Sequence, residues 1–361
     1  MKTGQAIRRG MRSYGRSLLS GSLLVCCMSC TDWIYEDRSG CDRGVYLNFR
    51  YDYNLQRADM FSDHVGGVTV YVFDADGDFV TSRSEANTAG SAPLRAKDYR
   101  MHLDLPAGEY RFVALAMQKE VAETQRGPGA KFRIAGPDGG KMEGLSVSLD
   151  HAPDGRVEHG GLPLDTLWHA MSPRSVVTSD LYAVSETLSL VRDTKHIDVV
   201  LREIDDPAGV DVADYDFRIT DRNLRLRYDN SVDESGPAVY TPYVAWNTED
   251  RTGREAAEGV GRMAHVGFMT SRILYHDRAE EDAVLTVTHR ETGREVIRVN
   301  LADMLARLRS ADELHACSEQ EFLDRGYDYR MTFFLKGDTW EAVDLEISVL
   351  NWSRRIQNVI L

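Results

Sequence analysis

Hydrophobic and polar side chains alternate along much of this chain, and the first clear case lies at residues 44–53. Val45, Leu47, Phe49 and Tyr51 are each separated from the next by a residue with a polar group. A period of two places successive side chains on opposite faces of a β-strand. The pattern therefore predicts a strand with one buried face over 44–53.

Turn sequences divide the β-rich runs that follow. Residues 68–73 are mostly β-branched and aromatic, and the pattern resumes at Phe79-Val80 after Asp74-Ala75-Asp76-Gly77-Asp78, which predicts a hairpin with an Asp-Gly turn. The Gly- and Pro-rich stretch 121–162 lacks clear periodicity and is expected to form long loops with one or two short strands. Further strands are expected at 101–105 and 110–116 around the turn 106–108, and at 196–201, 217–220, 224–228, 284–289, 295–299, 327–335 and 343–350.

Helical patterns are scarce. Apolar residues at 301, 304, 305 and 308 have the spacing of one helix face and follow Asn300, a favourable N-cap residue. Ser318-Glu319-Gln320-Glu321 has the form of a capping box and predicts a short helix through Asp324.

Short strands joined by Gly, Asp and Pro turns indicate an all-β chain, and 361 residues are enough for two domains. A parallel α/β fold is excluded because regular helices between the strands are missing. Residues 205–209, Asp-Asp-Pro-Ala-Gly, break the pattern near the middle and form the best candidate linker. We expect two β-sandwich domains in tandem with few short helices, at 44–204 and 205–361.

The first 29 residues have the organisation of a secretory signal. Five basic residues and no acid precede a stretch of about eleven mainly apolar residues, which is too short to span a bilayer core of about 30 Å. We therefore expect residues 1–29 to be removed on export, and we see no later stretch of membrane-spanning length.

Cysteines near the end of this signal suggest lipid attachment. Lipoprotein signal peptidase cuts before a cysteine that follows a small residue, and Cys30 follows Ser29. Cys27 is the second choice, whereas Cys26 follows the bulky Val25. We expect lipid at Cys30 and a lipidated tether over 30–43; the alternative is an ordinary signal peptide cut near Ser29, which leaves a soluble periplasmic protein.

Two thiols, Cys41 and Cys317, remain after such processing. They could pair in an oxidising compartment, or each could be an isolated buried thiol, and the sequence does not decide between these.

The charge distribution changes when the signal is removed. The whole chain has a net charge of −14, and loss of the five basic leader residues leaves 38 basic and 57 acidic residues, a net charge of −19. An acidic chain lacks the basic face that nucleic-acid binding requires.

Motifs for catalysis or cofactor binding are missing from the sequence. It has no G-x-S-x-G, P-loop, dinucleotide-binding or H-E-x-x-H pattern, so we expect no enzyme, no cofactor and no small-molecule substrate. His102, His196 and His289 lie on expected strands and are interpreted as half-exposed strand residues rather than metal ligands.

The acids at 74, 76 and 78 surround a glycine and invite comparison with a calcium-binding loop. An EF-hand needs its Gly after three alternating ligands and a Glu six residues further on, but Gly77 lies between the second and third acids and Arg83 occupies the later position. A tight turn is therefore the preferred interpretation.

Several segments together resemble the fimbrillin-associated anchor lipoproteins of Bacteroidales, the FimB-type minor fimbrial subunits. Examples are Leu105-Pro-Ala-Gly-Glu-Tyr110 and Asn351-Trp352, and their order and spacing are more specific than any single one. The matching segments are 30–41, 49–54, 58–61, 70–74, 105–110, 219–223, 228–230, 240–243, 320–325 and 351–361.

The resemblance implies two transthyretin-like β-sandwich domains, a lipid anchor in the outer membrane and surface exposure within a fimbrium. It further implies that the chain joins pilin subunits, anchors the fimbrium and limits its length. Relatives often have a second cysteine where this chain has Gly66-Gly67, so a family-type disulfide from Cys41 is not expected.

Fimbrial subunits join when a strand of one chain adds to a sheet of the next. A lipid-anchored subunit would keep its own first strand, so that polymerisation stops there. The segment 343–361 is the candidate to be offered to, or shared with, a neighbour, or else it completes the chain's own second domain. Its candidate contact residues are Val343, Leu345, Ile347, Val349 and Trp352.

A binding module is the alternative function. A surface lipoprotein that is not part of a fimbrium could bind glycan or host protein through an exposed Trp246 or Trp168. Burial is the more common environment for both tryptophans.

Overall fold

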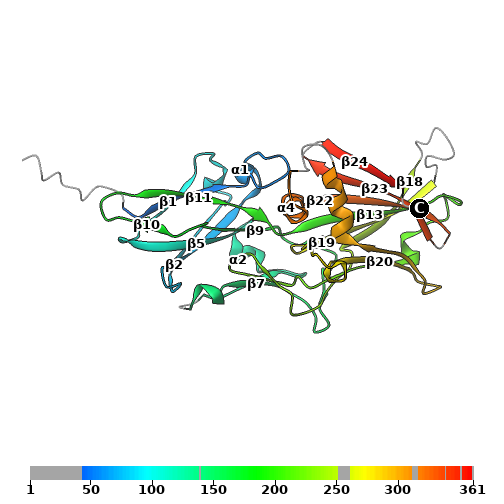
Figure 1. Cartoon of the computed structure of the whole chain (residues 1–361), viewed down its shortest axis with the longest axis horizontal. Helices are drawn as coiled ribbons and strands as arrows, with labels where there is room; N and C mark the ends of the chain where they lie inside the picture. Colours follow the sequence, from blue (N-terminus) through cyan, green and yellow to red (C-terminus); the bar gives the residue numbers. More distant parts are fainter. Residues whose placement is uncertain are drawn as a thin grey trace, which may run out of the picture. The chain divides into compact units, whose positions relative to one another are not determined.

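A computed structural model describes residues 43–137, 140–250, 261–310, 316–337, 339–349 and 352–359, which all lie in one compact unit. The described residues exclude the predicted signal peptide and all of the predicted tether except Arg43. The candidate cysteines Cys27, Cys30 and Cys41 therefore lie outside them. The all-β class is confirmed, and helices are few and short (Figure 1). That each half is a transthyretin-like domain stays a prediction.

Two sheets built mainly from the first half of the chain pack against each other around one core. One has the described order β11-β1-β4, and the other has the order β12-β9-β5-β2-β3, with β10 also paired to β5. Their strands are β1 (Val45–Arg50), β2 (Gly67–Asp74), β3 (Phe79–Ala86), β4 (Arg100–Leu103), β5 (Gly108–Met117), β9 (Leu167–Met171), β10 (Val176–Thr178), β11 (Val184–Ser189) and β12 (Val191–Arg192).

Two further sheets, built mainly from the second half of the chain, surround a second core. Their described orders are β18-β19-β13-β22-β23-β24 and β21-β20-β14-β17-β8. The strands are β8 (Arg156–Val157), β13 (Lys195–Glu203), β14 (Tyr215–Asp221), β17 (Ala238–Tyr240), β18 (Val244–Asp250), β19 (Gly261–Thr270), β20 (Val284–His289), β21 (Glu295–Asn300), β22 (Asp328–Lys336), β23 (Thr339–Val349) and β24 (Trp352–Val359).

A further sheet, which we call the shared sheet, connects the two halves. Its described order is β16-β15-β7-β6, from strands β6 (Phe132–Ala135), β7 (Ser146–Leu149), β15 (Arg225–Arg227) and β16 (Val232–Asp233). Val147 of β7 lies opposite Leu226 of β15, and Val157 of β8 lies opposite Tyr240 of β17. The stretch 121–162 is thus richer in strands than expected, because its short strands find partners far away in the sequence.

The predicted linker at 205–209 directly follows β13. Because β13 pairs with β19 and β22, it belongs to a sheet of the second half, although the sequence placed it in the first domain. The Pro207 carbonyl accepts a hydrogen bond from the Arg262 amide, so this turn also packs on β19. Whether 44–204 and 205–361 are separate domains stays a prediction.

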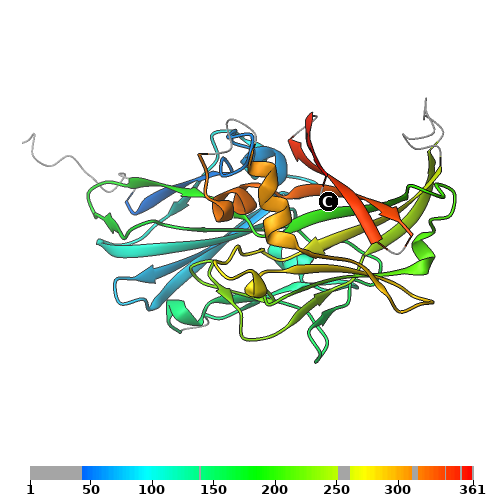
Figure 2. The same cartoon turned by 45° about the vertical axis from the view of Figure 1, so that its right-hand side comes forward.

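Both predicted helices are present and capped as expected. The Asn300 side chain accepts a hydrogen bond from the Asp303 amide, and the Ser318 side chain accepts one from the Glu321 amide. Helix α3 contacts β20 and β21, and the short helix η6 that follows it contacts β23, so this segment bridges two sheets (Figure 2). The helical elements are α1 (Phe61–His64), α2 (Val121–Thr124), α3 (Leu301–Ala306), α4 (Glu319–Arg325), η2 (Pro93–Arg95), η3 (Met142–Gly144), η4 (Val212–Asp214), η5 (Ala279–Glu281) and η6 (Arg307–Ser310).

Within the described ranges, no helix has the length and apolar character needed to cross a membrane.

Candidate functional site

The first strand occupies a slot between two other strands of its own chain. β1 runs parallel to β11, with Val45 opposite Val184, and antiparallel to β4, with Val45 also opposite Leu103. Its inward side chains Val45 and Leu47 have no exposed surface, and Phe49 is 6% exposed. Burial of three such side chains stabilises this position by several kcal/mol at roughly 1.5–3 kcal/mol each.

The residues before β1 fix the direction from which the chain reaches the slot. Gly44 has φ +87°, and a Cβ at this position would lie 2.1 Å from the Leu103 carbonyl oxygen. Arg43 forms an ion pair with Asp104 at 2.7 Å, and its carbonyl accepts a hydrogen bond from His102 Nε2. The end of the predicted tether is thereby held against β4.

The predicted strand-exchange segment includes a strand that is internal to its sheet. β23 pairs with β22 on one side and with β24 on the other. Val343, Leu345 and Ile347 point into the core and have no exposed surface. Val349 and Trp352 lie on β23 and β24 by their backbone, but their side chains are outside the described set. Among the described residues β24 pairs only with β23, so β24 forms an edge of the sheet.

The two candidate tryptophans differ in environment. Trp168 is fully buried, with the Arg192 guanidinium 5.9 Å from its ring centroid. Trp246 on β18 is 39% exposed and stacks on His265 with ring centroids 5.0 Å apart. Only Trp246 of this pair is therefore accessible to a ligand.

Of the two thiols that remain after removal of the signal, the structure describes only Cys317. Cys317 is 4% exposed and forms no disulfide with any described residue, while Cys41 lies outside the described residues. A Cβ on Gly66 would lie 1.9 Å from the Gln118 carbonyl oxygen, and one on Gly67 would lie 2.2 Å from the Lys119 carbonyl oxygen. The backbone at the end of β5 thus leaves no room for a cysteine at either position.

The acid-rich turn behaves as a turn. Asp74 Oδ1 accepts hydrogen bonds from the amides of Asp76 and Asp78 at 3.0 and 2.9 Å, and Gly77 has φ +76°. Lys141 forms an ion pair with Asp78 at 2.8 Å. In the described part of the chain, no three His, Cys, Asp or Glu side chains converge as a metal site would require.

The three strand histidines are half-buried, as expected. His196 is the most tightly held, with Nδ1 donating to Asp328 Oδ1 at 2.7 Å. Burial lowers the pKa of His196, but the hydrogen bond to Asp328 and the nearby Asp198 more than offset this, so the pKa is raised overall.

A buried polar cluster near the shared sheet was not predicted. We call it the junction cluster; it comprises Asp193, Lys195, Asn230, Arg272 and Asp324. Arg272 binds both carboxylate oxygens of Asp324, at 2.8 and 2.7 Å, and Asn230 donates to Asp193 at 2.9 Å. Lys195 Nζ donates to three backbone carbonyls, two of them at the end of α4.

Burial favours the neutral forms of two members of the junction cluster, Asp193 and Lys195. It raises the pKa of the Asp193 carboxyl and lowers the pKa of the Lys195 amine. The sequence offered no signal for this cluster, because its members come from four separate segments and follow no common spacing.

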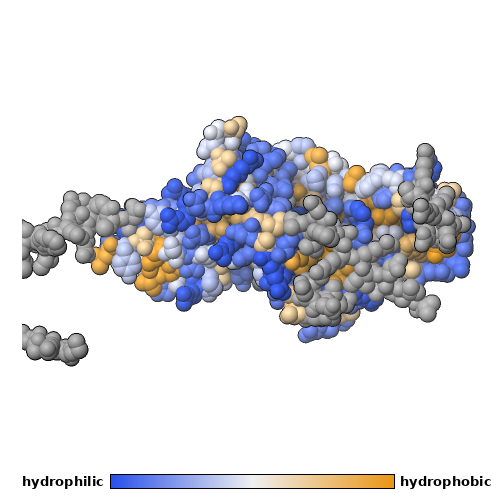
Figure 3. Space-filling model, turned by 90° about the horizontal axis from the view of Figure 1, so that it is seen from above, coloured by the Kyte–Doolittle hydropathy of each residue, from blue (hydrophilic) through white to orange (hydrophobic). Residues whose placement is uncertain are grey.

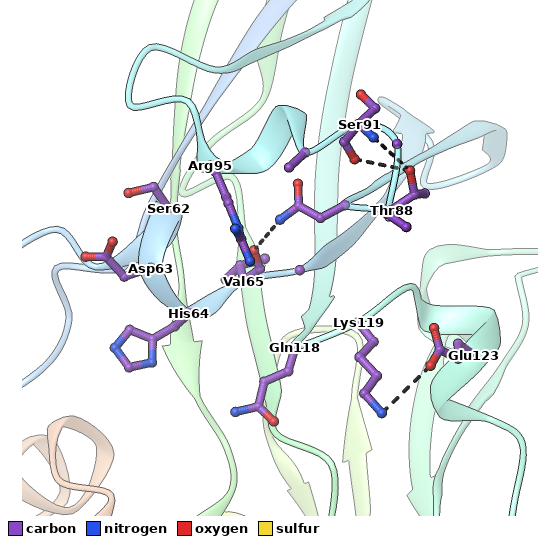
Figure 4. Close-up of a pocket in the computed structure, with 15 residues that line it drawn as sticks. Ser62, Asp63, His64, Val65, Thr88, Ser91, Arg95, Gln118, Lys119 and Glu123 are labelled. Carbon is purple, nitrogen blue, oxygen red and sulfur yellow. Dashed lines mark hydrogen bonds and ion pairs between the residues drawn. The ribbon is translucent and has the colours of Figure 1, made fainter.

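A polar pocket of about 740 Å³ lies in the first half, between α1, the loop after β3 and the end of β5 (Figure 4). Its lining carries charges of both signs, and Lys119 Nζ lies 3.7 Å from Glu123 Oε1. The ring of His64 is the one aromatic group among its described lining residues. This lining does not select a particular class of ligand.

Comparison with known proteins shows where this architecture recurs. The family model described as fimbrillin-A associated anchor proteins Mfa1 and Mfa2 matches residues 38–358. The minor fimbrium anchoring subunit Mfa2 of Porphyromonas gingivalis is 22% identical over 295 residues, which are 80% of this chain and 79% of that protein.

Solved structures agree with this match. A crystal structure from Bacteroides thetaiotaomicron, provisionally named an adhesin, is 29% identical and superposes with a TM-score of 0.69, covering 88% of this chain and 98% of that chain. The fimbrial anchor protein Mfa2 from Porphyromonas gingivalis superposes with a TM-score of 0.58 at 16% identity, covering 86% of this chain and 98% of that chain. Because the family match extends from just before β1 to the last residues of β24, the chain belongs to the fimbrillin-A associated anchor proteins, the family of Mfa1 and Mfa2.

Proposed function

We propose that this chain is an outer-membrane lipoprotein that anchors a fimbrium and ends its polymerisation. The family supports a fimbrium-associated anchor subunit. The observation that carries the finer proposal is β1, which fills the slot between β11 and β4 with its own buried side chains.

A filled slot has a direct consequence for assembly by strand addition. An incoming strand gains affinity from backbone hydrogen bonds and specificity from side-chain pockets. Here β1 already uses the backbone edges of β11 and β4 and fills the apolar pockets between them. A neighbouring subunit would have to displace β1, so the chain offers no acceptor at this end, and the fimbrium stops growing toward the membrane.

Lipid at Cys30 supplies the attachment in this proposal. Each acyl CH₂ buried in the bilayer contributes roughly 0.8 kcal/mol, so a multiply acylated cysteine is a stable anchor. Cys30→Ala should release the chain and its fimbriae into the medium, and Cys27→Ala should leave them attached. Membrane retention of Cys30→Ala, with an intact mass showing acylation at Cys27, would move the site to Cys27.

The C-terminal edge is the proposed contact with the next subunit. β24 could accept a neighbour's strand at its free edge, or it could leave β23 and add to the neighbour. Deletion of residues 353–361 separates this role from a purely internal one. We expect shorter or detached fimbriae by electron microscopy of whole cells, and normal attachment and length would refute a role for this edge.

A binding module is the second candidate function, and the exposed Trp246 stacked on His265 favours it. The similar Bacteroides structure bears a provisional adhesin name, which is compatible with such a role. Cross-linking on cells followed by purification separates the two functions. Recovery of a polymeric pilin supports the anchor, while glycan binding that is lost in Trp246→Ala, without any pilin, supports the binding module.

A further inference from the structure

The most exposed large hydrophobic side chains of the described residues lie on β10 and on the loop that follows it. Val177 is 69% exposed, Tyr182 is 61% exposed and Leu181 is 58% exposed. Pro106 and Ala107, in the turn between β4 and β5, are exposed beside them. We call these five residues the apolar tip.

Hydrogen bonds hold the two segments of the apolar tip together. Thr178 Oγ1 donates to the Pro106 carbonyl at 2.6 Å, and the Ala107 amide donates to Asp180 Oδ1 at 3.0 Å. In Figure 3, hydrophobic surface is visible at the end of the described unit where β10 lies in Figure 1. The two segments are therefore joined into one continuous surface.

The apolar tip lies beside the point where the described chain begins. The Val184 amide, just after the tip loop, donates to the Gly44 carbonyl at 3.0 Å. Cys30 precedes Arg43 by thirteen residues, which can span about 45 Å at full extension. A lipid on Cys30 would thus keep this end of the chain within that distance of the bilayer.

We propose that the apolar tip inserts into the lipid surface next to the acylated cysteine and sets the orientation of the anchor on the membrane. This inference rests on the proposed lipidation of Cys30. The side chains suit a membrane interface, because Leu and Val enter the acyl boundary while Tyr keeps its hydroxyl among the headgroups.

Charge does not drive this contact. Arg43 forms an ion pair with Asp104, and the Asp180 carboxylate accepts a hydrogen bond from the Ala107 amide. The tip therefore has no excess of basic groups that would attract anionic headgroups. Insertion should therefore change little with salt, in contrast to a polybasic membrane site.

The test measures the depth of the tip in a bilayer. Full-length protein purified from cell membranes is reconstituted into phosphatidylcholine vesicles, with and without added phosphatidylglycerol, and brominated phosphatidylcholine serves as the quencher. Tyr182→Trp places a fluorophore in the tip, and Leu162→Trp places one at an exposed site (42% exposed) on another loop as a matched control. We expect the fluorescence added by Tyr182→Trp to be quenched at least twofold in either lipid, and that added by Leu162→Trp to be unquenched.

Each other outcome counts against the proposal in a distinguishable way. If the protein is retained in membranes but Tyr182→Trp is no more quenched than Leu162→Trp, the tip does not insert, although the lipid anchor stands. If the protein is not retained in membranes, the lipid anchor fails and the tip proposal fails with it. If Leu181→Asp converts a dimer to a monomer in detergent without changing the quenching at position 182, the tip is an interface between two copies.

Discussion

His169 is a buried histidine, 5% exposed, whose Nε2 donates to the Tyr228 carbonyl at 2.7 Å. Burial lowers its pKa to about 4, because the hydrogen bond to the Tyr228 carbonyl and the charge of Asp229 offset only part of the lost hydration of the charged ring. The unfolded chain binds this proton near pH 6.5, so the folding stability contributed by neutral His169 is present above that pH and is lost as pH falls toward 4. The loss amounts to about 3 kcal/mol at most.

His169→Gln should remove this pH dependence, since glutamine can donate to the same carbonyl but does not titrate. We expect the difference in unfolding free energy between wild type and variant to shrink by up to about 3 kcal/mol between pH 7 and pH 4 in urea titrations. His151→Gln, at an exposed histidine, serves as the control and should follow wild type at both pH values. A constant difference between wild type and His169→Gln would show that His169 is not the group that titrates.

At the scale of elements, the sequence predicted well those features that depend on neighbouring residues. The caps at Asn300 and Ser318 involve amides three residues away, and the hairpin at Gly77 depends on one turn. One or two short strands were expected within 121–162, but their positions were not predicted, because β7 pairs with residues nearly eighty positions later and is too short to show a period. The junction cluster was not predicted either, because its charged side chains lie far apart in the sequence and come together only on folding.

The turn before β1 offers a direct test of how firmly the first strand is held. Gly44→Ala places a Cβ 2.1 Å from the Leu103 carbonyl at φ +87°, so the chain must shift away from β4 or accept strain. We expect a loss of at least about 2 kcal/mol in the free energy of unfolding. Hydrogen exchange should also show faster exchange of the β1 amides.

Gly90→Ala provides the matched control, because a Cβ there meets no heavy atom within 4 Å and the residue lies outside the left-handed region. This variant should be as stable as wild type. Equal stability of the two variants would mean that β1 reaches its slot by a different backbone path.

On the scale of the whole molecule, the shared sheet makes the two halves dependent on each other. β6 and β7 come from the first half of the sequence, yet their buried residues belong to the core of the second half. The junction cluster adds contacts between the halves, because Lys195 Nζ donates both to the Arg192 carbonyl of β12 and to the Asp324 carbonyl of α4. We therefore expect residues 43–359 to unfold as one cooperative unit rather than as two domains divided near residue 205.

Leu226→Ala tests this cooperativity, because Leu226 is 2% exposed and lies opposite Val147 in the shared sheet. Removal of its buried side chain should lower the free energy of unfolding by about 2–5 kcal/mol. In native-state hydrogen exchange, the most protected amides of β2 in the first half and β22 in the second should lose the same free energy of protection. Val177→Ala, at the exposed position on β10, should change neither set. If Leu226→Ala weakens protection in β22 alone, the halves unfold separately and the division near residue 205 regains its support.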